Sequence, residues 1–167
     1  MSMEDQADKQ KRPRALLGLA GFLGLCLIVS ALGGAITATS VGDWYQTLAK
    51  PSFNPPDWVF GPVWTVLYIM MAVAGWRIWR RHGFGGVPIA MSLFGAQLAL
   101  NLAWSFLFFG LRSPSLALID IFLLLIAILG TMGAFRPCDR IAFWLLVPYA
   151  LWVTYATVLN AAIVYLN

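Results

Sequence analysis

Five stretches of this chain are apolar and long enough to cross a lipid bilayer, and this constrains the fold more than any other feature. A helix needs roughly 20 apolar residues to span a hydrocarbon core about 30 Å thick. The stretches are 15–38, 58–76, 87–109, 115–135 and 141–166, and only the fourth contains a charge, Asp120. Because backbone groups in lipid must be hydrogen-bonded within the protein, each stretch is predicted to be helical. The predicted fold class is an all-α integral membrane protein, a bundle of five transmembrane helices.

Composition and connection lengths support one membrane domain. The chain is 60% hydrophobic and only 11% charged, whereas soluble domains carry about 25% charged residues. Connections are short except between the first and second helices, so we expect a single domain over 15–167. A charged tail, 1–14, precedes it and is predicted to be disordered. The net charge of +4 is spread over this tail and a few loops. It therefore indicates no nucleic-acid partner.

The first apolar stretch resembles a signal peptide, because basic residues precede it. Its length of about 24 residues exceeds the 7–15 of a signal-peptide core, so we interpret it as a retained helix. Gly18, Gly21 and Gly24 fit close packing of that helix in the bundle. Cleavage remains the alternative.

Lysine and arginine residues predict the orientation, because they accumulate on the cytoplasmic side. With the N-terminus inside, inside segments hold nine of the eleven basic residues: Lys9, Lys11, Arg12, Arg14, Arg77, Arg80, Arg81, Arg136 and Arg140. Arg80, Arg81 and His82 are expected in the loop after the second helix. Only Lys50 and Arg112 lie outside. The C-terminus is thus predicted outside, which suits a multi-pass protein of a bacterial inner membrane.

The long first loop, 39–57, carries signals for local structure. Asp43 can cap a short helix over 44–49, and Pro51 ends it by restricting Lys50. Pro55 and Pro56 then stiffen the entry to the second helix. We expect an ordered lid; a plain connector is the alternative.

Three predicted helices each present large aromatic side chains on one face, at three- and four-residue spacing. These faces carry Phe60, Trp64 and Tyr68 on the second helix, Gln97, Asn101, Trp104 and Phe108 on the third, and Trp152, Ala156 and Leu159 on the fifth, with Tyr149 and Asn160 at its flanks. Aromatic walls with a few amides are typical of a small-molecule pocket and suit a flat, apolar ligand. The amides could instead join helices.

Residues for ordinary catalysis are not found. The sequence has no Ser-His-Asp set, P-loop, metal triad or haem ligand within a span, and Cys26 and Cys138 have no metal-site spacing. We therefore predict no catalytic residue, no metal ligand and no obligatory cofactor. Asp120 is interpreted as a hydrogen-bonded structural acid near the outer interface, with a functional intramembrane acid as the alternative.

Three motifs resemble the TspO/MBR family of tryptophan-rich sensory and translocator proteins, once called the peripheral-type benzodiazepine receptor. They are "DWYQTLAKPSFNPPDWVFGPVWTVLY", "QLALNLAWSFLFFG" and "PYALWVTYATVLN". The resemblance implies a receptor or translocator-like five-helix bundle, often a homodimer. It also implies binding of protoporphyrin IX, haem or other tetrapyrroles, and of sterol-like or benzodiazepine-type ligands.

The resemblance places the ligand pocket under the first loop. The residues matched to it by motif are Tyr45, Pro55 or Pro56, Trp64, Tyr68, Asn101, Trp104, Trp152, Ala156 and Leu159. Light-dependent porphyrin breakdown, involving Trp64 and Trp152, is the alternative function that the resemblance implies. A structural membrane protein with a packed core is a third hypothesis. The chain departs from the sterol motif of animal members, because Ala161 occupies its tyrosine position.

Overall fold

The five predicted spans are all present as long helices. The computed structural model describes the backbone of residues 3–167 and the side chains from Arg14 onward. Within these residues, five helices are long and apolar enough to cross a membrane. The helices are α1 (Met3–Ala38), the lid helix α2 (Trp44–Thr47), α3 (Phe60–Gly86), α4 (Pro88–Ser105), α5 (Pro114–Phe135) and α6 (Arg140–Leu166), with a 3-10 turn, η1 (Asp57–Val59), before α3 and a π-helical turn, η2 (Phe106–Gly110), after α4.

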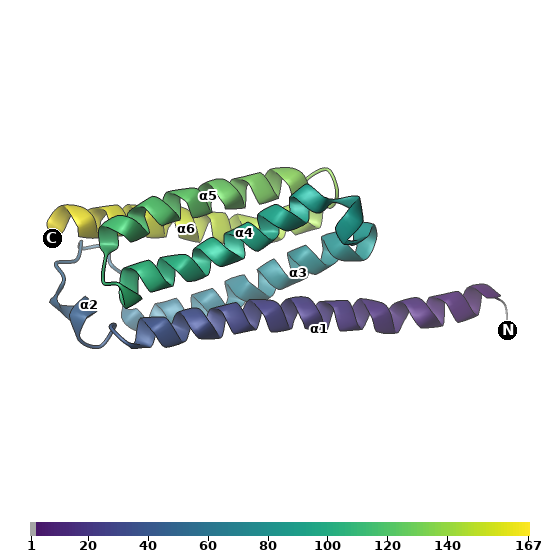
Figure 1. The fold of residues 1–167 in the computed structure, drawn as a ribbon, viewed down its shortest axis with the longest axis horizontal. Coiled ribbons are helices and arrows are strands. Elements are labelled where there is room, and N and C mark those ends of the chain that lie inside the picture. Colours follow the sequence, from purple (N-terminus) through teal and green to yellow (C-terminus); the bar gives the residue numbers. More distant parts are fainter. Residues whose placement is uncertain (1–2) are drawn as a thin grey trace.

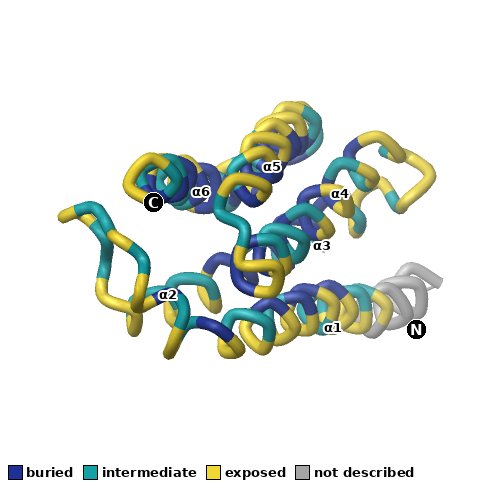
Figure 2. Tube along the Cα trace, turned by 60° about the vertical axis from the view of Figure 1, so that its left-hand side comes forward, coloured by how far each residue is buried: buried dark blue, intermediate teal, exposed yellow. Residues whose placement is uncertain are grey.

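The long helices lie side by side and close a ring. Helix α1 packs on α3, α3 on α6, α6 on α5, α5 on α4, and α4 again on α1. Figure 1 shows α2 and the C-terminus together at one end of the bundle, which we call the lid end. The α3–α4 and α5–α6 connections lie at the opposite end, the far end. Buried positions face the interior, while α1, α4 and α5 expose much of their outer faces (Figure 2).

Three boundaries differ from the prediction. Helix α1 begins at Met3, so the segment expected to be disordered is helical from that residue on. Helix α3 continues past Trp76, so the arginines and His82 predicted in a loop lie on helix. Arginine is a good helix former, and the backbone leaves helical geometry only at Gly83, whose φ of 65° favours glycine. Helix α2 ends at Thr47, because extended backbone already begins at Leu48.

The contact between α1 and α3 depends on Gly18. A Cβ at Gly18 would lie 2.0 Å from a ring carbon of Trp79, so any larger residue would force the Trp79 ring to move. The neighbouring Trp76 donates its indole N–H to the carbonyl of Ala15 at 2.7 Å. The predicted close packing is therefore confirmed at Gly18. It is wrong at Gly21 and Gly24, where a Cβ would meet nothing within 4 Å.

Candidate functional site

The first loop is an ordered lid over the end of the bundle. Asp43 caps α2 by accepting the backbone N–H of Trp44, as the sequence predicted. Tyr45 is buried, packs its ring on Phe108, and donates its hydroxyl to Asn54 Oδ1 at 2.9 Å. Burial raises the pKa of Tyr45 to about 12; the charge of Asp57 adds to this rise and the Asn54 bond opposes it. The hydroxyl is thus a neutral donor at physiological pH.

Hydrogen bonds to α6 hold the rest of the lid in place. The Tyr155 hydroxyl donates to the carbonyl of Phe53 at 2.7 Å. The Asn167 side chain accepts the N–H of Ala49 and donates to its carbonyl, both at 3.0 Å. The lid and the last turns of α6 therefore form one connected unit.

A buried polar network joins three helices beneath the lid. Asn101 of α4 accepts the Tyr68 hydroxyl of α3 at 2.9 Å and donates to the Tyr149 hydroxyl of α6 at 2.8 Å. All three residues are buried. Nearby, Trp104 donates its indole N–H to Asn160 Oδ1 at 3.1 Å, and Asn160 donates to the carbonyl at the start of α5 at 2.9 Å. Of the two uses considered for the amides, joining helices is the one that Asn101 performs.

Other buried polar atoms have no hydrogen-bond partner in the described part of the chain. They are both side-chain amide atoms of Gln97, the Nε1 of Trp152 and one carboxyl oxygen, Oδ2, of Asp120. Gln97 is fully buried, with an exposed fraction of 0%. Leaving such a group unpaired costs about 1–3 kcal/mol. The expected hydrogen bonding of Asp120 is therefore wrong at Oδ2, which helix packing buries without a donor.

Aromatic rings wall a small cavity at the centre of this region. Trp64 lies against Tyr68 and Tyr149, with ring centroids 5.7 and 6.2 Å apart, and Phe60 meets Trp152 at 5.9 Å. The cavity has a volume of ≈10 Å³, about the room that one water needs. Its lining comes from α3, α4, α5 and α6: Trp64, Asn101, Trp104, Ile121, Leu124, Val153 and Ala156.

The sequence comparisons agree with this architecture. Residues 22–166 match the sequence signature of the TspO/MBR family. The chain is 46% identical over 158 residues to the tryptophan-rich protein TspO of Chlorobaculum tepidum, covering 92% of this chain and 98% of that one. It is 39% identical over 152 residues to the TspO of Archaeoglobus fulgidus, covering 91% and 98%. It is 40% identical over 119 residues to the human translocator protein, covering 70% of each chain.

The chain belongs to the TspO/MBR family. This membership and the five spans make it an integral, multi-pass membrane protein of receptor or translocator type. The membrane bundle that the motifs implied is thus confirmed.

The TspO/MBR fold brings most of the predicted site residues together, in two adjoining groups. Trp64, Asn101, Trp104 and Ala156 line the cavity. Tyr45, Phe108, Leu159 and Phe60 instead pack in a cluster between the lid and the bundle. Pro56 is exposed and lies at the N-cap position of η1. Pro55 is half-buried, and its backbone carbonyl accepts a hydrogen bond from the side-chain amide of Asn54. Gln97 lies outside the cavity lining.

For two polar residues of the site, the sequence predicted a less central position than the structure shows. Tyr149 and Asn160 were placed at the flanks of the fifth-helix face, yet both are buried partners of the α4 residues. The signal was present for Asn160, because an amide at membrane depth must find partners. Ile121 and Leu124 of α5 also line the cavity. The sequence did not single them out, because most of α5 is uniformly apolar and no face of it stands out.

Proposed function

We propose that this TspO/MBR protein binds a tetrapyrrole such as protoporphyrin IX between α3, α4 and α6, under the lid. The observation that carries the proposal is the convergence of two indole rings, Trp64 and Trp104, and one amide, Asn101, on one cavity. Flat aromatic faces suit a flat macrocycle. The unpartnered N–H of Trp152 and the amide of Gln97 offer hydrogen bonds that no described residue uses. Haem and sterol-like molecules are further candidate ligands.

Binding requires the site to open. A cavity of ≈10 Å³ is far smaller than the 300–1,000 Å³ typical of ligand sites. The ligand must therefore displace the lid or separate α6 from its neighbours, and displacing the lid breaks the hydrogen bonds of Phe53 and Ala49 with Tyr155 and Asn167. A packed structural core is the competing hypothesis, and a binding titration separates the two.

The test is a titration of the purified protein with protoporphyrin IX, followed by the porphyrin absorption band and by tryptophan quenching. Trp64 touches Tyr68 and Tyr149 in the interior, whereas Trp58 is 75% exposed. We expect Trp64→Ala to weaken binding by about tenfold or more, and Trp58→Ala to leave it within about twofold. Non-saturable quenching, or equal losses in both variants, would contradict the proposal. Haem and a sterol are titrated in parallel.

Light-dependent porphyrin breakdown is the alternative function for the same site. Trp152 packs on Phe60 and Tyr155 under the lid, so its indole would meet a bound macrocycle. Illumination of the bound complex distinguishes the two functions. A discrete product, formed at catalytic turnover and lost in Trp152→Phe, would favour breakdown. Porphyrin loss at the same rate in that variant would favour binding alone.

We also propose a homodimer in a bacterial inner membrane, with the N-terminus in the cytoplasm. Small residues on α4 support the dimer, because they let two helices approach closely. Ser92, Ala96 and Ala99 are exposed on the outer face of α4, and Ala103 is half-buried beside them. Cross-linking in native membranes tests it: Ala96→Cys should give a dimer band, and Leu123→Cys on the exposed face of α5 should not.

A further inference from the structure

A basic cleft lies at the far end of the bundle, away from the tetrapyrrole site. It has a volume of ≈530 Å³ and lies between the end of α3 and the turn that joins α5 to α6. Its lining is Arg81, Arg136, Pro137, Cys138, Asp139 and Arg140. The lining thus holds three arginines and one acidic residue in an open, water-accessible space.

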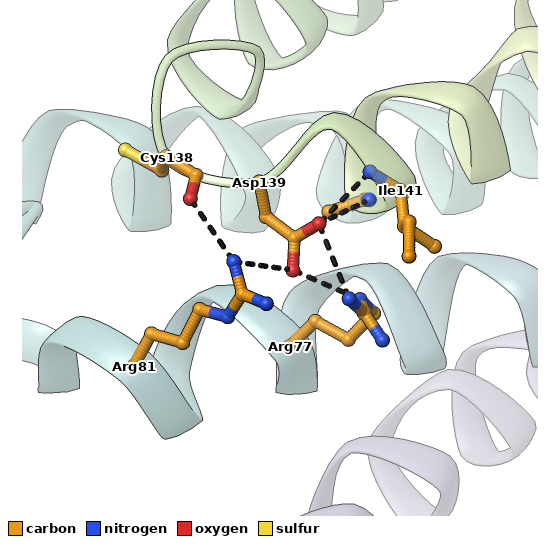
Figure 3. A network of polar contacts seen from close by, with 6 residues as sticks. Arg77, Arg81, Cys138, Asp139 and Ile141 are labelled. Carbon is orange, nitrogen blue, oxygen red and sulfur yellow. Dashed lines mark hydrogen bonds and ion pairs between the residues drawn. The ribbon is translucent and has the colours of Figure 1, made fainter.

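The single carboxylate is already fully engaged (Figure 3). Asp139 accepts two hydrogen bonds from Arg77, at 2.9 and 3.3 Å, and pairs with Arg81 at 3.3 Å. It also caps α6 by accepting the N–H groups of Ile141 and Ala142. Burial opposes ionisation of Asp139, but the Arg77 bond, the two N–H bonds and the Arg77 charge together lower its pKa.

Two consequences follow for an anion in the cleft. Asp139 occupies the N-terminal N–H groups of α6, so the helix end offers no anion site of its own. Its side chain is only 2% exposed and is neutralised by Arg77, so it presents little negative charge to the cleft. Any anion would be held by arginine side chains.

Arg136 and Arg140 are the arginines available to bind an anion in the cleft. Both are exposed, and neither forms an ion pair among the residues whose side chains the structure describes. Arg136 lies over the ring of Phe143, 5.9 Å from its centroid, which orients the guanidinium. Arginine binds phosphate through two parallel N–H bonds. Two such groups beside Arg81 therefore supply several N–H donors for the oxygens of one phosphate.

The surroundings of the cleft point to a lipid as the source of that phosphate. Arg140 is the first residue of a membrane-spanning helix. Ile141 and Trp144 follow it and are 55% and 66% exposed. Exposed tryptophan at a helix end is typical of the level where hydrocarbon meets headgroups. The cleft thus opens at headgroup depth, beside an apolar surface that acyl chains can cover.

We propose that Arg136 and Arg140, together with Arg81, bind the phosphate of an anionic phospholipid headgroup in the leaflet at the far end of the bundle. Basic pockets between transmembrane helices are suited to such headgroups. The site is separate from the tetrapyrrole pocket, so its occupancy does not depend on the proposed function.

The experiment measures thermal unfolding of the full chain in a non-ionic, phosphate-free detergent. Dioctanoyl phosphatidylglycerol is titrated against dioctanoyl phosphatidylcholine, and inorganic phosphate is a third arm. We expect phosphatidylglycerol to raise the unfolding temperature saturably and phosphatidylcholine to raise it little. Arg136→Gln and Arg140→Gln should each weaken the apparent affinity by about tenfold.

Arg80→Gln is the matched control. Arg80 lies at the same end and is exposed, but it sits over Trp76 and lies outside the cleft lining. Its affinity for phosphatidylglycerol should stay within about twofold of the parent. An equal loss of affinity in Arg80→Gln would show that phosphatidylglycerol is held by diffuse surface charge, and it would overturn the proposal. Equal shifts with both lipids, or the same shift with inorganic phosphate, would overturn it as well.

Discussion

At the scale of single residues, two buried amides in neighbouring turns of α4 behave differently. Asn101 satisfies two tyrosine hydroxyls from two other helices. Gln97 is equally buried and has no partner in the described part of the chain. The sequence alone treats them alike, because both are amides on one helix face. The difference comes from which hydroxyls the neighbouring helices bring within reach.

This difference predicts opposite effects of similar substitutions. Asn101→Leu leaves the hydroxyls of Tyr68 and Tyr149 unpaired, so we expect the free energy of unfolding to fall by about 1–3 kcal/mol per unpaired group. Gln97→Leu removes two unsatisfied atoms and should leave stability unchanged or higher. Thermal unfolding in detergent compares the two. Similar losses in both variants would show that Gln97 has a partner in solution.

At the scale of elements, α1 and α3 approach closely at glycines, and the tightest of these positions is Gly18. We expect Gly18→Ala to destabilise the bundle by about 1–3 kcal/mol, because its new methyl group overlaps the ring of Trp79. Gly21→Ala is the control: its methyl group meets nothing within 4 Å, and alanine favours helix by about 1 kcal/mol. Thermal unfolding and tryptophan emission measure the difference. Equal effects would show that α1 shifts to accommodate the Gly18 methyl group.

The cap of α6 gives a prediction for pH dependence. Because the folded state lowers the pKa of Asp139 below its ordinary 3.8, the folded state binds fewer protons there than the unfolded state. The stabilisation is therefore fully present above about pH 5 and is lost as pH falls through the lowered pKa. Asp139→Asn should unfold at a lower temperature at pH 7, and its deficit should shrink below about pH 4. A deficit that is constant down to pH 3 would contradict this.

At the scale of the whole molecule, the orientation is testable from both ends. The test uses introduced cysteines at Lys50, which is half-buried in the lid, and at His82, which is exposed, in a background with Cys26 and Cys138 replaced by alanine. We expect an impermeant maleimide to label Lys50→Cys in intact cells, because the proposed orientation places the lid end on the outer side. His82→Cys should react only after lysis. The reverse pattern would overturn the orientation inferred from the basic residues.

Much of this architecture could be predicted from the sequence because the bilayer sets it. Span lengths follow from hydrocarbon thickness, so all five were found. The end of α3 was misplaced because its arginines resemble a loop, whereas they are also good helix formers and the helix breaks only at Gly83. The site faces of Trp64, Asn101 and Trp104 follow from helical periodicity. The closure of the cavity does not, because it depends on how side chains from four helices fill one volume.

Gln97 has no hydrogen-bond partner among the described residues, and this affects the stability of the closed state. A closed state that hides an amide without partners is less stable than its packing alone would make it. Any opening that admits water, or a ligand with a matching polar atom, recovers that loss. The closed and open states are therefore closer in free energy than they would be with leucine at this position. In the proposed opening, Gln97 therefore shifts the equilibrium toward the open state without needing to touch the ligand itself.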